Sequence, residues 1–205
     1  MFYREVAKWL PLALEFLKEG GKDEDFANKE PPSKTDDFLA ELVKHGMRDL
    51  SELIFEPMER IKEIMDEVED IINDMDRIYD KMEEYVNVLH NKFKSNQDVN
   101  ELFNAIKELL EKHKIKMDKN YISEVYKELE KHRTELNLVM KELRKARKEA
   151  EKVYFYSAVV FLCITLRLDD PKKYTEKIIN NMNNILDEIF EIRKRLSQII
   201  PTSPS

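Results

Sequence analysis

The chain has 205 residues, of which 42% are hydrophobic and 38% are charged, and its formal net charge at pH 7 is -7. The hydrophobic share is enough for a core and excludes a disordered chain, while the mixed charges exclude indiscriminate nucleic-acid binding. The single cysteine, Cys163, excludes an intrachain disulfide and every zinc site that needs two cysteines, which favours a reducing, cytoplasmic setting. Abundant Lys, Glu and Ile with only three glycines is typical of long helices and would also suit a thermophile.

Residues 1–19 predict an amphipathic helix that ends at Gly20 and Gly21. Its charged residues also exclude the apolar core of a signal peptide. Residues 20–35 are rich in glycine, proline and charge, so we expect a flexible linker. The helix could then dock on its own bundle, which is the default, on a second copy, or in a partner's groove. Its candidate interaction residues are Phe2, Val6, Trp9 and Leu10.

A short helix is expected from Asp36 to His45, with Gly46 as a left-handed C-terminal cap. The first long helix follows, because apolar residues recur at steps of four and three from Ile54 to Phe93. A third apolar position in each heptad suits a bundle core better than a two-helix seam. The residues at this third position are Ile64, Ile71, Ile78 and Tyr85.

Ser95 and Asp98 fit a capping box, so the first long helix is expected to stop near Lys94. Residues 95–113 could then fold back along that helix or extend it, and the pattern leaves both possibilities open. A second apolar seam, from Ile122 to Ile164, predicts one long helix. Residues 201–205 form a tail that we expect to be disordered.

The last helix is expected to begin at Asp169, Asp170 and Pro171, which supply N-cap acceptors and a first-turn proline, and to end near Ile200. So short a turn requires the second and third long helices to be antiparallel. Around residues 153–168 the second helix is apolar on every side, so we expect it to be covered on every side. The stretch is too short to span a membrane.

The predicted fold is therefore all-α: an elongated antiparallel bundle over residues 36–200, with three long helices, shorter N-terminal helices and coiled-coil-like packing. We expect a thick end of four or five helices, where residues 153–168 lie. A thinner stalk should lead to a tip near residues 95–125.

Two groups of side chains could hold a divalent metal, which is the only cofactor that the sequence suggests. Glu63, Glu67, Asp70 and Asp74 share one side of the first long helix, although charges are expected on that side in any case. His132 occupies a seam position with Glu128 and Glu135 one turn away, and His90 and His113 could approach it if the chain folds back. A carboxylate/histidine bundle, ferritin-like in architecture only, is thus one alternative function; no Glu-x-x-His motif supports it.

A second alternative is a nucleic-acid-associated helical subunit that uses a basic stretch of the second long helix. Ion pairing with the acidic first helix explains this stretch better, because it contains no aromatic residues and no module that reads nucleic acid. Its candidate phosphate contacts are Lys141, Arg144, Lys145, Arg147 and Lys148.

The favoured function is a non-enzymatic scaffold or adaptor that binds a protein partner or itself. No catalytic residue is predicted, because Cys163 lies in the most apolar part of the chain, where a buried packing role is expected. Self-association through exposed parts of the seams would make the protein a homo-oligomer. We expect neither a membrane span nor a nucleic-acid partner.

Overall fold

A computed structural model describes residues 1–32, 34–94 and 119–199. Contacts divide the chain into two compact units, which are described separately below. Unit 1 comprises Met1–Glu69 and Lys141–Lys194, and unit 2 comprises Asp70–Met140 and Arg195–Ser205. The structure does not describe residues 95–118 and 200–205. Four predictions fall there and lie outside the described residues: the capping box, the fold-back or extension of residues 95–113, most of the tip, and the tail.

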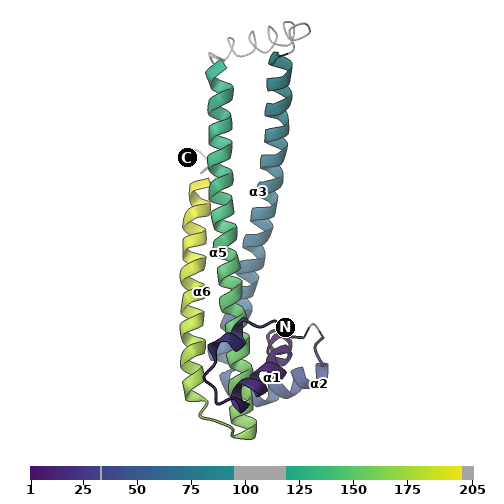
Figure 1. Ribbon diagram of the computed structural model, residues 1–205, viewed down its shortest axis with the longest axis vertical. Helices are drawn as coiled ribbons and strands as arrows, with labels where there is room; N and C mark the ends of the chain where they lie inside the picture. Colours follow the sequence, from purple (N-terminus) through teal and green to yellow (C-terminus); the bar gives the residue numbers. More distant parts are fainter. Residues whose placement is uncertain (33, 95–118, 200–205) are drawn as a thin grey trace. The chain divides into compact units, whose positions relative to one another are not determined.

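The described residues form helices and no strand, which confirms the predicted all-α bundle (Figure 1). Local sequence explains most of the helix boundaries. The longer helices are α1 (Phe2–Lys18), α2 (Asp37–Gly46), α3 (Glu56–Lys94), α5 (Lys119–Leu166) and α6 (Lys172–Ile199). Three shorter ones are the 3-10 helices η1 (Glu24–Asn28) and η2 (Arg48–Leu50) and the π-helix η3 (Ser51–Phe55).

The structure confirms Asp170 as an N-cap acceptor, although Pro171 precedes the first residue of α6, Lys172. The backbone N–H of Lys172 donates to the Asp170 carboxylate at 3.0 Å. Asp170 thus satisfies one of the backbone N–H groups that have no partner within the first turn of α6. The backbone N–H of Asp170 in turn donates to the Asp169 carboxylate at 2.7 Å. In the same way Asp36 accepts from the backbone N–H of Phe38 at 2.8 Å and starts α2.

Aromatic side chains fill the core of unit 1. Phe155 on α5 is fully buried, and its ring meets the rings of Trp9 and Phe16 edge to face, at centroid distances of 5.8 and 5.3 Å. Phe16 also contacts the ring of Tyr174 on α6 at 5.8 Å. Such pairs contribute about 0.5–1.5 kcal/mol each beyond their burial. Helix α1 therefore covers the apolar part of α5, as the all-round apolar pattern predicted.

The coverage of α5 ends before the predicted limit of residue 168. Every residue from Val153 to Cys163 is buried, but Ile164, Leu166 and Leu168 are 43–56% exposed. Helix α5 ends at Leu166, so these side chains lie at the corner that leads to α6, where fewer neighbours surround the chain.

The expected linker, residues 20–35, contains structure that its composition does not suggest. Residues 24–28 form η1, in which Phe26 is 1% exposed and contacts the ring of Phe16 at 5.9 Å. Gly20 and Gly21 both have positive φ, 93° and 67°, and end α1 as predicted. The flexibility of the segment stays a prediction.

Gly46 corrects one expectation, because it is the last residue of α2 and not a left-handed cap. Its role is close packing. A Cβ at this position would lie 2.5 Å from Cε2 of Phe161 on α5, so only a residue without a side chain lets the two segments approach this closely.

Polar pairs contribute to unit 2, beside buried aliphatic residues such as Ile72, Leu136 and Val139. The Tyr79 hydroxyl on α3 lies 3.1 Å from His132 Nδ1 on α5. Arg133 of α5 pairs with two carboxylates of α3, Asp80 and Glu83 (2.8 Å for Glu83). A polar layer of this kind favours one helix register over others.

An equivalent ion-pair triad lies in unit 1, where Arg147 of α5 pairs with Asp66 (3.4 Å) and Glu69 of α3. In both triads one arginine meets two acids three residues apart, as the faces of antiparallel helices allow. We call these the Arg147 clamp and the Arg133 clamp. The predicted pairing between the basic stretch and the acidic first helix is thus confirmed for Arg147.

Candidate functional site

Helix α6 carries a second apolar row besides the one that packs into the core. Ile179, Leu186 and Phe190 are 52%, 50% and 68% exposed, although their types belong in a core. At 100° per residue their positions fall within about 40° of one another, so they form one row along the helix. We call Ile179, Leu186 and Phe190 the α6 row; it belongs entirely to unit 1. Sequence reasoning missed this row, although the spacing i, i+7, i+11 was readable.

Helix α3 carries a row with the same spacing in unit 2. Ile71, Ile78 and Met82 are 41%, 56% and 44% exposed; we call them the α3 row. Ile71 and Ile78 occupy the third apolar position of the heptads, which was expected to face a bundle core. That expectation is wrong for these two residues, because no described helix covers them. Ile64 is half-buried, and the side chain of Tyr85 lies outside the described residues.

The predicted interaction residues of α1 are core residues of unit 1. Phe2, Val6, Trp9 and Leu10 are between 0% and 8% exposed. The ring of Phe2, for example, contacts that of Tyr154 on α5 at 5.8 Å. Helix α1 therefore docks on its own chain, and these four side chains are not free to meet a partner.

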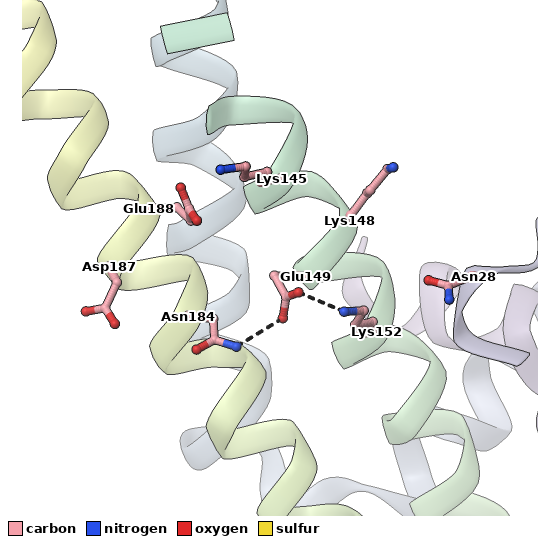
Figure 2. Close-up of a pocket in the computed structure, with 8 residues that line it drawn as sticks. All are labelled: Asn28, Lys145, Lys148, Glu149, Lys152, Asn184, Asp187 and Glu188. Atoms are coloured by element: carbon pink, nitrogen blue, oxygen red, sulfur yellow. Dashed lines mark hydrogen bonds and ion pairs between the residues drawn. The ribbon is translucent and has the colours of Figure 1, made fainter. Parts of the chain in front are cut away.

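A polar pocket of about 320 Å³ lies in unit 1 between α5, α6 and the end of η1. Figure 2 shows how its lining residues pair with one another: Glu149 accepts from Lys152 at 2.8 Å and from the Asn184 amide at 3.4 Å. Lys148 points away from these groups. The full lining is Asn28, Lys145, Lys148, Glu149, Lys152, Asn184, Asp187 and Glu188. Its three lysines are matched by three carboxylates, so it offers no net positive charge to a phosphate.

One carboxyl group beside this pocket has an altered acidity. A hydrogen bond with the Glu142 side chain raises the pKa of Glu188 to about 7, and partial burial and the negative charge of Glu142 act in the same direction. Lys145, which is 3.3 Å from Glu142, opposes the shift. Glu188 can therefore keep a proton near neutral pH and donate it to the Glu142 carboxylate.

Two of the five candidate phosphate contacts pair with acids of their own chain. Arg147 is engaged in its clamp, and Lys145 pairs with Glu142. Lys141, Arg144 and Lys148 are at least partly exposed. A role of this stretch in phosphate binding stays a prediction.

His132 makes a different contact from the predicted metal site. Its Nδ1 faces the Tyr79 hydroxyl, whose pKa is raised by burial, and its Nε2 lies 3.7 Å from Glu128. Glu135 points elsewhere and accepts from Arg195 at 3.2 Å. The trio of His132, Glu128 and Glu135 therefore does not converge.

The acidic candidates Glu63, Glu67, Asp70 and Asp74 all lie at least partly exposed on α3. Within residues 1–32, 34–94 and 119–199, no three side chains of His, Cys, Asp or Glu form a group that could hold a metal ion. Cys163 is buried, and burial raises the pKa of its thiol to about 11, so it carries no thiolate at neutral pH.

Comparisons with known proteins give no relative. No protein-family model, no curated protein and no solved structure matches the chain. A search of the described helices for membrane spans finds none that is long and apolar enough. The exposed rows of α6 and α3 are thus the features from which a function can be argued.

Proposed function

We propose that this protein is a non-enzymatic helical scaffold that associates with further copies of itself through the α6 row and the α3 row. The observation that carries the proposal is that the six large apolar side chains of these rows are exposed at helical spacing on two helices. Single exposed apolar residues are normal on a protein surface, whereas grouped ones mark contacts with other molecules.

A second copy is the partner that the charges favour. Beside the α3 row, Asp70 and Asp74 lie toward the start of the helix, and Arg77 and Lys81 lie toward its end. Acids followed by bases along one helix complement the same helix running in the opposite direction. A different protein would need to match this pattern, while a second copy matches it by symmetry.

Two further observations support a non-enzymatic role. In the α5–α6 pocket Glu149 pairs with Lys152 and Asn184, and the buried Cys163 thiol is a poor nucleophile. A cytoplasmic location is part of the proposal, because a single buried thiol has no need of an oxidising compartment.

The test is native mass spectrometry and sedimentation velocity of the full chain over a wide concentration range. We expect a reversible dimer or larger assembly that becomes more populated as concentration rises. Phe190→Glu and Ile78→Glu each place a charge in one row and should reduce assembly. Asn180→Glu adds the same charge to an exposed position of α6 outside the row and should not. A chain that stays monomeric at the highest concentration would refute the proposal.

A further inference from the structure

The charges beside the α3 row define an orientation. At 100° per residue, Asp74 and Lys81 lie within about 60° of Ile78 on the same side of the row. Both side chains are exposed, and Asp74 also pairs with Arg77, itself 74% exposed. The opposite side of the row adjoins the core, where Tyr79 is 7% exposed. Only one flank of the row is therefore available for contacts between charged groups.

A two-fold axis perpendicular to the helix brings this flank against the same flank of a second copy. The two helices are then antiparallel, and the flanking positions of antiparallel coiled coils meet in like pairs. Parallel pairing would instead place this flank against the opposite flank of the second copy, which adjoins the core at Tyr79 and offers no charge to Asp74 or Lys81. The charges favour the antiparallel arrangement.

The apolar residues select a register for that arrangement. With the axis between residues 76 and 77, Ile71 faces Met82 of the second copy, and Ile78 faces the half-buried Met75. All members of the α3 row are then covered. In the same register Asp74 lies beside Lys81 of the second copy, and the symmetry makes this pair twice.

The α6 row fits a second copy less well in the equivalent arrangement. Ile179 then faces Phe190 of the second copy, but Leu186 faces Asn183, so one apolar residue in three lies against a polar partner. On α3 the same register also pairs opposite charges, whereas on α6 it leaves one apolar residue without an apolar partner.

We propose that α3 pairs with α3 of a second copy of this chain, antiparallel about a two-fold axis between residues 76 and 77, with Asp74 of each copy beside Lys81 of the other. This inference rests on the proposed self-association and adds its surface, its orientation and its register.

Charge reversal tests the pair. Asp74→Lys leaves two lysines opposite each other, and Lys81→Glu leaves two acids, so each variant alone should weaken the dimer about 10-fold, since two ion pairs become two repulsions. The double variant D74K/K81E restores opposite charges and should recover the wild-type dissociation constant, measured by sedimentation equilibrium. Raised salt should reduce all these differences.

Mixing the two single variants is the sharper test. The Asp74→Lys copy is basic at both positions and the Lys81→Glu copy is acidic at both, so the two copies complement each other at both pairs. Native mass spectrometry should therefore show the mixed dimer in excess over either homodimer. Asp76→Lys is the matched control, because Asp76 is exposed on the opposite side of the same helix. Circular dichroism checks that every variant keeps its helix content.

The outcomes separate this inference from the function on which it rests. If the wild-type chain is monomeric, both fail. If the wild type assembles but the single variants assemble equally well and mix statistically, the α3 pairing is refuted and self-association stands. If the single variants are weakened but the double variant is not restored, the antiparallel register is refuted.

Discussion

Unit 1 has an aromatic core, whereas unit 2 combines polar pairs with buried aliphatic residues. In unit 1, rings from η1, α5 and α6 pack around Phe16 of α1, which is 1% exposed. In unit 2 the contacts between α3 and α5 include the Tyr79–His132 pair and the Arg133 clamp. Burial of large apolar groups supplies free energy, whereas polar pairs supply little of it and mainly exclude other registers. The comparison predicts that stability resides in the aromatic core and register in the pairs.

The largest expected effect is from Phe155→Ala. Removing a fully buried ring should lower the free energy of unfolding by about 3–5 kcal/mol, because both transfer and cavity terms are lost. Urea unfolding followed by circular dichroism measures it. Phe190→Ala makes the same change at a side chain that is 68% exposed, and it should stay within about 0.5 kcal/mol of wild type. Similar losses for the two variants would contradict the assignment of the core.

A smaller loss is expected from Gly46→Ala. Alanine would normally stabilise a helix by about 1 kcal/mol relative to glycine, but here the new Cβ meets the Phe161 ring at 2.5 Å. Overpacking should outweigh the gain and cost about 1–3 kcal/mol in a thermal or urea denaturation. Adding Phe161→Leu should make the double variant more stable than the sum of the two single losses predicts. Additive losses would show that the contact is not the cause.

The two clamps should each contribute little. Arg147→Met and Arg133→Met keep an apolar stem and remove the charge, and their side chains are 38% and 35% exposed. Each substitution should therefore cost less than about 1 kcal/mol, and high salt should reduce the cost further. A loss of several kcal/mol for Arg133→Met alone would break the comparison, since unit 2 would then depend on its ion pairs for stability.

The smallest effect concerns pH. Because the pKa of Glu188 in the fold, about 7, is above the ordinary glutamate range, the folded state binds this proton more tightly than the unfolded state. The stabilisation is complete below the ordinary glutamate pKa and is lost as pH rises through 7. The melting temperature should therefore fall slightly between pH 5 and pH 8.

Glu188→Gln can still donate to Glu142 without ionising, so it should flatten this fall and raise the melting temperature at pH 8. Glu191→Gln removes a charge from an exposed position of the same helix and should leave the slope unchanged. An equal slope for wild type and Glu188→Gln would show that Glu188 does not keep this proton.

The sequence predicted those parts of the fold that depend on local patterns. Apolar seams identified α3, α5 and α6, and Asp170 identified the start of α6, because helix periodicity and capping are properties of neighbouring residues. It could not show that Ile71 and Ile78 lack cover, since an apolar position has the same pattern whether or not another helix lies over it.

Contacts between distant residues were also beyond sequence reasoning. The approach of Gly46 to Phe161 and the hydrogen bond between Glu142 and Glu188 depend on tertiary packing, which a single sequence does not encode at any fixed spacing. The α6 row is a different case, because its residues were visible beside the core seam. It was missed because only one apolar row was assigned to each helix.

The aromatic core of unit 1 also determines an order of events during synthesis. Phe16 of α1 emerges early, but its partner Phe155 follows roughly 140 residues later, which is roughly 7–30 s at ordinary translation rates. Throughout that interval the apolar side of α1 has none of its α5 and α6 partners. Helix α1 is thus synthesised well before it can be buried, because its burial waits until α5 is complete.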